Sequence, residues 1–207
     1  MRRARLEAGL GIVVSARIAL FAYGSLVSAV SAERTLGRPI EGTLAVRLPG
    51  WRRRWSQVRD NQATEKTFAH AESGLVPSHC LGLNVEPDPG GEGPNGALIE
   101  ISEDELERLA LREIRYDRID VTEAIGPEAR PFTRVATFTA KPENFSPTPP
   151  PGAVILAPYL REVEAGFGVL GPGQLELFRS TTGPAPVEVI ESVLIRDEIP
   201  PGNPRNW

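Results

Sequence analysis

Residues 16–26 read "ARIALFAYGSL", an apolar run that ends on Tyr23-Gly24-Ser25-Leu26. The apolar and β-branched residues from Ile12 to Ala22 predict a buried strand. Gly-Ser directly after such a strand indicates a tight turn, because glycine permits backbone geometries and close approaches that other residues do not. Whether this turn has a function depends on whether later residues need a small-residue turn at that place.

The composition is that of a globular protein, with 41% hydrophobic and 24% charged residues among 207. The net charge of -4 lacks the basic footprint of nucleic-acid binders, so no nucleic-acid partner is expected. Cys80 is the only cysteine, which excludes an internal disulfide and favours a reducing compartment. Since no stretch approaches the roughly 18 apolar residues of a membrane span, we expect a cytoplasmic protein without membrane association.

The length suits one domain with tails, which we place at residues 18–183. Residues 1–17 begin with arginines and a short apolar stretch, like a weak signal peptide. Glu7 interrupts that pattern, so we interpret the segment as a flexible leader rather than a secretion signal. Residues 184–207 are predicted to form a strand-like or extended C-terminal extension.

The middle of the chain alternates short strands with glycine- and proline-rich loops. Residues 32–40 look like a polar connector, and residues 41–58 predict a strand, a Pro-Gly turn and a second strand. Residues 60–78 are polar and weakly patterned. Two strands at residues 80–87 and 97–101 flank a Gly-Pro-rich loop, which predicts a hairpin.

The clearest helix spans residues 102–113. Ser102 as N-cap and Glu105 three residues later form a capping box, with Ile101 and Leu106 in the positions of a hydrophobic staple. Two further strands are expected at residues 116–125 and 132–140, and two helical pieces end at Gly171 and Gly183. Many strands with few helices predict an α+β fold rather than a doubly wound α/β fold.

One carboxylate lies on an unexpected face of the predicted helix. At about 100° per residue, Glu113 falls within the apolar stripe of Leu106, Leu109 and Ala110, whereas Arg112 falls outside it. A carboxyl group buried there would have a raised pKa suited to proton transfer near neutral pH. Alternatively, the stripe has left the core at the helix end, and Glu113 meets solvent or Arg115. The residues alone leave both interpretations open.

Other candidate sites carry weaker signals. Two histidines, His70 and His79, without a cysteine or histidine cluster predict no metal site. Cys80 beside His79 could be a thiol nucleophile, but strand neighbours point to opposite faces, which favours a core cysteine. The run at residues 52–54 is either an anion-binding patch or a source of surface ion pairs.

Three features together resemble the γ-glutamylcyclotransferase superfamily. These are "YGSL" after the first strand, a helix ending in "LxxRE" at residues 109–113, and a tyrosine shortly after it. The segment "GWRRRWS" is similar to the "RRFW" segment of the ChaC-type branch, and residues 158–171 resemble a tyrosine-containing, glycine-ended segment of the family. The likeness runs from about residue 19 to residue 183.

The resemblance implies a small mixed β-barrel flanked by helices, and a reaction that releases 5-oxoproline without a metal or cofactor. It implies that Glu113 is the catalytic acid and base. The turn residues Tyr23, Gly24, Ser25 and Leu26 would bind the γ-glutamyl head group of a small-molecule substrate.

Tyr116 and Tyr159 could line the same pocket or be core tyrosines with bonded hydroxyls. Where the family often has an aspartate this chain has Ala110, and the spacing from Glu113 to Tyr116 is compact. Small γ-glutamyl amines or dipeptides are therefore expected over glutathione. A non-catalytic binding or regulatory protein that uses the same cavity is the alternative. No feature of the sequence defines the oligomeric state, and exposed barrel surface would allow a homodimer.

Overall fold

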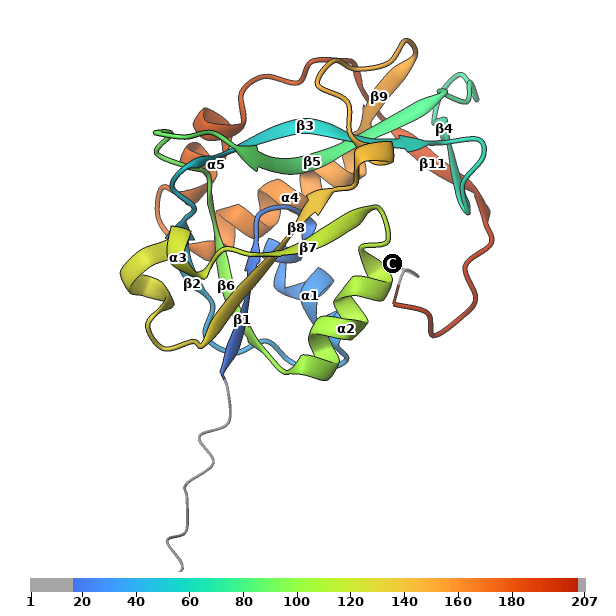
Figure 1. Ribbon diagram of the computed structural model, residues 1–207. Helices are drawn as coiled ribbons and strands as arrows, with labels where there is room; N and C mark the ends of the chain where they lie inside the picture. Colours follow the sequence, from blue (N-terminus) through green and yellow to red (C-terminus); the bar gives the residue numbers. More distant parts are fainter. Residues whose placement is uncertain (1–16, 205–207) are drawn as a thin grey trace, which may run out of the picture.

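The computed structural model describes residues 17–204, and these form an α+β fold as the sequence predicts (Figure 1). The strands are β1 (Ile18–Ala22), β2 (Leu44–Arg47), β3 (Trp51–Asp60), β4 (Lys66–His70), β5 (His79–Pro87), β6 (Asn95–Ile101), β7 (Tyr116–Asp120), β8 (Arg134–Ala140), β9 (Ala153–Leu156), β10 (Val189–Ile190) and β11 (Ser192–Asp197). The helices are α1 (Ala29–Leu36), α2 (Glu103–Arg112), α3 (Thr122–Ile125), α4 (Ala157–Leu170) and α5 (Gln174–Thr182). Three 3₁₀ turns are η1 (Ser25–Val27), η2 (Gly126–Ala129) and η3 (Pro142–Asn144).

Strand β1 is the centre of a five-stranded sheet with the order β2-β6-β1-β8-β7. All five of its residues are buried, which explains why its sequence is a continuous apolar run rather than an alternating one. It pairs antiparallel with β6 and parallel with β8, and β7 then pairs antiparallel with β8. The apolar run of residues 18–22 is therefore the middle of the core.

A four-stranded sheet, β10-β9-β5-β3, faces the first, and β4 pairs with β11 in a separate two-stranded sheet. The hydrogen-bonded ladders among the described residues do not join into one closed ring. Side chains bridge part of the gap, since Asn84 of β5 accepts from the Ala140 backbone at 2.7 Å and Thr139 donates to the Val85 carbonyl at 2.9 Å. Side-chain bonds, rather than a continuous backbone ladder, thus link β5 to β8.

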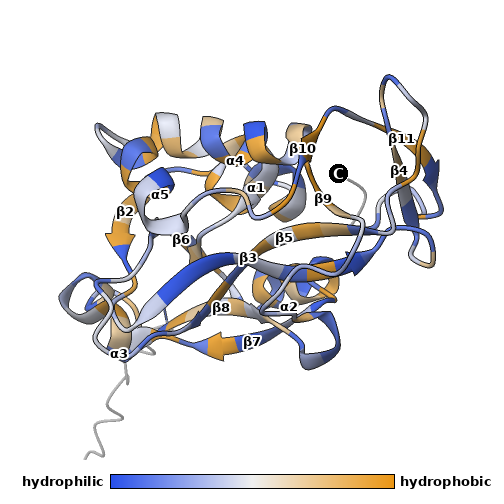
Figure 2. Cartoon of the chain, turned by 90° about the horizontal axis from the view of Figure 1, so that it is seen from above, coloured by the Kyte–Doolittle hydropathy of each residue, from blue (hydrophilic) through white to orange (hydrophobic). Residues whose placement is uncertain are grey.

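The helices cover the strands from outside, with α4 and α5 together on one side (Figure 2). The predicted capping box of α2 is confirmed: Ser102 Oγ accepts from the Glu105 backbone at 3.2 Å, and Glu105 accepts from the Ser102 backbone at 2.8 Å. The helices α4 and α5 occur as expected, with Gly171 and Gly183 at their C-caps. Helix α4 packs directly on η1, because a Cβ on Gly166 would lie 2.6 Å from the Ser28 nitrogen.

Several local predictions were wrong. The expected connector contains helix α1, which Ser28 caps at its N-terminus and Gly37, at φ 75°, caps at its C-terminus. Strand β4 lies in the segment predicted to be unpatterned, and residues 122–125 are the helix α3 instead of a strand. The expected hairpin is not one, because β5 and β6 belong to different sheets. Local patterns identified β5 and β6 as strands but not the strands with which they pair.

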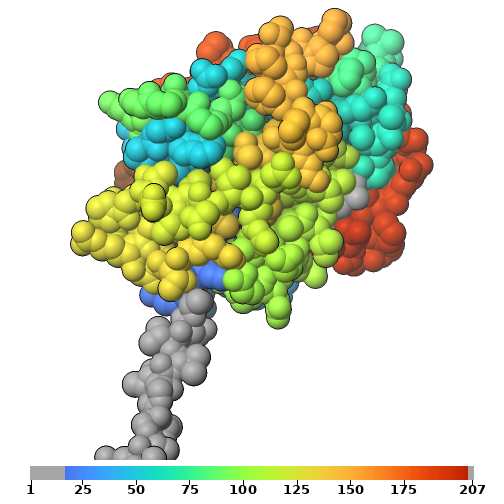
Figure 3. Space-filling model, viewed as in Figure 1, coloured from blue at the N-terminus to red at the C-terminus, as the bar shows by residue number. Residues whose placement is uncertain are grey.

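The predicted tails lie partly outside the described residues. Of the leader, Arg17 alone is described, and it forms a two-point ion pair with Glu100. In the C-terminal extension, β10 pairs with β9 and β11 pairs with β4, so the extension completes two sheets. Figure 3 shows this segment, in red, against the cyan surface that includes β4.

Candidate active site

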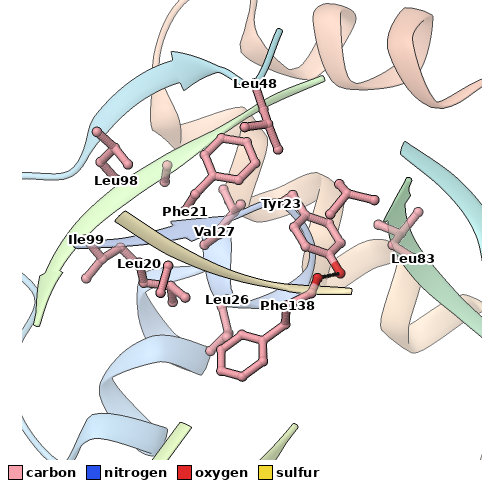
Figure 4. Packing of buried hydrophobic residues seen from close by; sticks show 14 of the residues in the cluster. Leu20, Phe21, Tyr23, Leu26, Val27, Leu48, Leu83, Leu98, Ile99 and Phe138 are labelled. Carbon is pink, nitrogen blue, oxygen red and sulfur yellow. Dashed lines mark hydrogen bonds between the residues drawn. The ribbon is translucent and has the colours of Figure 1, made fainter. Parts of the chain in front are cut away.

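Three distant segments meet at one edge of the five-stranded sheet. Strands β1 and β8 are parallel and therefore end at the same edge, where antiparallel β7 begins. Tyr23 follows β1, Tyr116 opens β7, and Phe138 lies near the end of β8. The Tyr23 hydroxyl donates to the Phe138 carbonyl at 2.6 Å, the bond drawn in Figure 4. The sheet topology alone thus brings the tyrosines of the turn and of β7 to one place.

The turn after β1 is a single 3₁₀ turn. The Val27 N–H donates to the Gly24 carbonyl at 3.0 Å and the Ser28 N–H to the Ser25 carbonyl at 3.1 Å. The N–H groups of Ser25 and Leu26 precede these bonds, so no carbonyl of the turn can accept from them. A Cβ on Gly24 would lie 3.4 Å from the Tyr159 hydroxyl. The missing side chain therefore keeps the space between the turn and α4 open.

Two tyrosine hydroxyls hold the backbone of one residue in β5. Tyr116 donates to the Leu83 carbonyl at 2.8 Å, and the Leu83 N–H donates to the Tyr159 hydroxyl at 3.4 Å. Leu83 lies beside the irregularity in the β3–β5 register, where a strand partner would otherwise satisfy these groups. Both tyrosines thus have the bonded hydroxyls of structural residues and also face the cavity described below.

Glu113 is the C-cap of α2 rather than part of its last turn. Leu106 and Leu109 are fully buried as the stripe predicts, whereas the Glu113 side chain is 19% exposed. Its carboxylate lies 3.1 Å from Nε of Arg112. Burial raises the pKa of Glu113, while the charges of Arg112 and Arg115 lower it. Burial thus favours the interpretation with a raised pKa, although the carboxyl group lies just beyond the helical stripe.

Arg112 is the main residue of the site that the sequence did not identify. The helical angle placed it outside the apolar stripe, but it is 7% exposed because α1 covers that side of α2. Its guanidinium donates to Ser25 Oγ at 3.2 Å, to Ser31 and to Thr35. Arg112 therefore joins the turn after β1 to Glu113. Ser31 and Thr35 lie four residues apart on one face of α1, and this spacing could have indicated a buried partner such as Arg112 only if α1 had been predicted.

All seven predicted site residues line one cavity of about 160 Å³. The turn residues follow β1 and enter η1, the glutamate caps the C-terminus of α2, and the two later tyrosines come from β7 and α4. Burial is the largest cause of the raised pKa of Tyr23, of Tyr116 and of Tyr159, the last to about 12. The three phenols are therefore neutral hydrogen-bond donors or acceptors at physiological pH.

The same cavity is also lined by residues of β3, β4, β5 and the C-terminal extension, and we call this part of its wall the distal end. It is lined by Arg59, Lys66, Phe68, Cys80 and Ile199. Lys66 is buried and lies 3.5 Å from Asp197 of β11. On the rim, Arg115 pairs with both oxygens of Glu65, at 2.9 and 2.7 Å. The C-terminal extension thus contributes to the cavity wall, which the sequence did not predict.

The remaining sequence candidates have structural roles. Cys80 is 5% exposed and burial raises its pKa, in agreement with a core cysteine; it also borders the distal end. Arg52 and Arg54 both pair with Glu86, as the ion-pair interpretation expects. Arg53 is instead buried, where it donates to the Tyr23 carbonyl at 3.2 Å and stacks on Phe178. It supports the backbone immediately before the turn.

Within residues 17–204, no three His, Cys, Asp or Glu side chains gather in a way that could hold a metal ion. No helix in that part of the chain is long and apolar enough to cross a bilayer.

Comparisons with known proteins support the fold. No family model matches the chain, and neither does any curated protein sequence. Among solved structures, a gamma-glutamyl cyclotransferase superposes with a TM-score of 0.50 and 14% identity, over 84% of this chain and 94% of that one. An uncharacterised protein from Homo sapiens superposes with a TM-score of 0.51 and 14% identity, over 83% and 90% of the two chains. The chain therefore has the fold of gamma-glutamyl cyclotransferase.

Proposed function

We propose that this protein is a γ-glutamylcyclotransferase that releases 5-oxoproline and a free amine or amino acid from a γ-glutamyl compound. One observation carries the proposal. On a fold similar to that of a gamma-glutamyl cyclotransferase, the partly buried carboxyl group of Glu113 and the open Gly24–Leu26 turn border the same cavity.

The reaction is an intramolecular displacement. The α-amine nitrogen of the glutamyl unit forms a bond to its own γ-carbonyl carbon, and the γ-amide C–N bond then breaks. The attacking nitrogen loses a proton and the leaving nitrogen gains one. Because the nucleophile is already attached to its electrophile, holding the curled conformer supplies much of the rate.

Glu113 is proposed to take the proton from the amine and return it to the leaving nitrogen. Such general acid–base catalysis typically contributes about 10²–10⁴-fold. A pKa raised by burial suits this role, since the carboxylate becomes a stronger base than an exposed glutamate. Arg112 keeps the carboxylate oriented through its 3.1 Å contact.

The head group is proposed to bind at the turn. Its α-carboxylate accepts hydrogen bonds from the Ser25 and Leu26 N–H groups, with the Arg112 charge behind Ser25. Tyr159 uses its oxygen to accept from Leu83, which leaves its hydroxyl hydrogen for the substrate. Tyr23 and Tyr116 form the wall that keeps the glutamyl chain curled.

For the tail beyond the γ-amide, we propose small γ-glutamyl amines or dipeptides rather than glutathione. The cytoplasm is the proposed compartment, since the chain has a single cysteine. We also propose that the protein forms a homodimer.

The proposal is tested by 5-oxoproline release from γ-glutamylalanine, a γ-glutamyl alkylamine and glutathione, with N-acetylated γ-glutamylalanine as the blocked substrate. We expect turnover of the first two, slower turnover of glutathione and none of the blocked compound. Turnover of the N-acetylated compound would contradict the mechanism. If the substrates with a free α-amine bind but no 5-oxoproline is released, the protein is the non-catalytic binding or regulatory alternative.

Glu113→Gln tests the assignment of the general base. The variant keeps an oxygen that can accept from Arg112, so we expect a folded protein whose kcat falls about 10²–10⁴-fold. Glu107→Gln is the matched control on the same helix, where the side chain is 65% exposed and pairs with Arg118. Near-normal activity of folded Glu113→Gln would remove Glu113 from the mechanism.

A further inference from the structure

Gln57 of β3 is a buried amide with an unused donor. The residue is 6% exposed, and its Nε2 has no hydrogen-bond partner within residues 17–204. The side chain lines the same cavity as Glu113 and the turn. A buried N–H group without an acceptor destabilises the fold, so such a group in a cavity indicates that something else supplies the acceptor.

The local strand geometry explains why this amide reaches the cavity. The β3–β5 register shifts between Arg54 and Gln57, and such irregularities redirect side chains next to functional sites. Opposite Gln57 in the ladder is Gly82. A Cβ on Gly82 would lie 2.5 Å from Gln57 Oε1 and 3.3 Å from the Tyr116 hydroxyl. The missing side chain of Gly82 therefore makes room for both the Gln57 amide and the Tyr116 hydroxyl.

The position of the amide along β5 matches one part of the proposed substrate. The tyrosine hydroxyls that border the head-group region bind Leu83, Gly82 is the next residue, and Cys80 borders the distal end. At about 3.3 Å per residue, Gln57 lies roughly 3 Å beyond the tyrosines and Cys80 roughly 10 Å beyond them. A scissile amide between the head group and the tail would therefore lie at the level of Gln57.

We propose that Gln57 Nε2 donates to the oxygen of the scissile γ-carbonyl, and that Gly82 is the residue that makes this contact possible. The inference rests on the proposed cyclotransferase function. The γ-carbonyl oxygen gains negative charge as the α-amine nitrogen attacks. The Tyr116 hydroxyl donates to Leu83 and the Tyr159 hydroxyl is assigned to the head group, so we assign the Gln57 amide to that charge. A fixed donor at this point stabilises the transition state more than the ground state.

The test compares Gln57→Leu with wild type in kcat, KM and Tm. We expect kcat to fall about 10²–10³-fold with KM within about threefold of wild type, as for loss of an oxyanion donor. The Tm should stay or rise, because leucine removes a buried donor without a partner. A Gln57 with a structural role would instead lower the Tm and leave kcat of the folded enzyme unchanged, which would overturn the inference.

Two further variants sharpen the test. Gly82→Ala crowds the Gln57 amide without removing it, so kcat should fall by less than in Gln57→Leu. Gln62→Leu makes the same replacement at an exposed position and should behave as wild type. Equal kcat for Gln57→Leu and Gln62→Leu refutes the role of Gln57 and leaves the proposed function intact. If wild type releases no 5-oxoproline from any substrate, the proposed function fails and this inference fails with it.

Discussion

The two ends of the cavity are built in different ways. At the reacting end, hydroxyls and backbone groups from β7, α4 and β5 hold one another, as Tyr116 and Tyr159 hold Leu83. At the distal end, charged side chains pair across the small β4–β11 sheet, as Lys66 does with Asp197. Rigid contacts suit a single chemical step, whereas a small peripheral sheet can vary without disturbing the core. We infer that the first end determines the reaction and the second selects the leaving group.

Among the variants that test the separate roles of the two ends, Gly24→Val is expected to cause the largest loss of kcat/KM. A Cβ there already lies 3.4 Å from the Tyr159 hydroxyl, so branched methyl groups would fill the space proposed for the head group. Because displacements of about 1 Å can cost on the order of 10²-fold in rate, kcat/KM should fall at least that far for every tail. Steady-state kinetics measures the loss.

Gly168→Val is the control, since a Cβ on that exposed α4 glycine meets nothing within 4 Å. If Gly24→Val is folded and turns over γ-glutamyl substrates as wild type does, the head group binds elsewhere.

Arg112→Met should have the next largest effect, on stability and on pH dependence. Removing one member of a buried ion pair typically costs about 3–5 kcal/mol, here with the Ser25, Ser31 and Thr35 bonds lost as well. Denaturant unfolding measures this cost. Arg118→Met is the matched control, because Arg118 forms an exposed ion pair with Glu107. Its loss should lower the free energy of unfolding by at most about 1 kcal/mol.

Arg112→Met is also expected to shift the pH dependence of kcat/KM in a defined direction. As a base, Glu113 must be ionised, so activity falls as pH drops through its raised pKa. Arg112 lowers that pKa, and its loss should move the acid limb of kcat/KM to higher pH. For stability the sign is opposite: a raised carboxyl pKa stabilises the fold at low pH, and this is lost as pH rises through it.

Arg115→Met should also move the acid limb of kcat/KM to higher pH, but by less than Arg112→Met. Arg115 also lowers the pKa of Glu113, and it lies nearer the surface than Arg112. An acid limb unchanged in both variants would show that another group titrates.

Ile199→Ala should have the smallest effect, confined to the choice of tail. Ile199 is 8% exposed and belongs to the C-terminal extension that closes the distal end. The substitution removes three carbon atoms from the cavity wall, and a single methylene in a hydrophobic pocket already alters discrimination by about 10-fold. We expect the kcat/KM ratio between a γ-glutamyl alkylamine and γ-glutamylalanine to change by about that factor, with kcat for γ-glutamylalanine nearly constant. Equal losses for both substrates would refute separate roles for the two ends.

The elements that depend on near neighbours along the chain can be read from the amino-acid sequence. A continuous apolar run followed by Gly24-Ser25 specified the central strand and its turn, and Ser102 with Glu105 specified the start of α2. The capping and staple contacts span only three to five residues, so they are readable along the chain. The same kind of signal was present for α1, in Ser28 and Gly37, but the short apolar face of that helix concealed it.

The tertiary structure decided every feature that depends on which strands and helices become neighbours. The packing of α1 on α2 buried Arg112, which the helical pattern had placed on a polar face. The shifted β3–β5 register set Gln57 opposite Gly82, and β11 paired with β4 to bring Ile199 to the cavity. A one-residue change of register would reverse the faces of a strand, and no local pattern encodes the partner that sets it. The physical reason is that these contacts join residues far apart in the chain, where burial and pairing outweigh local preference.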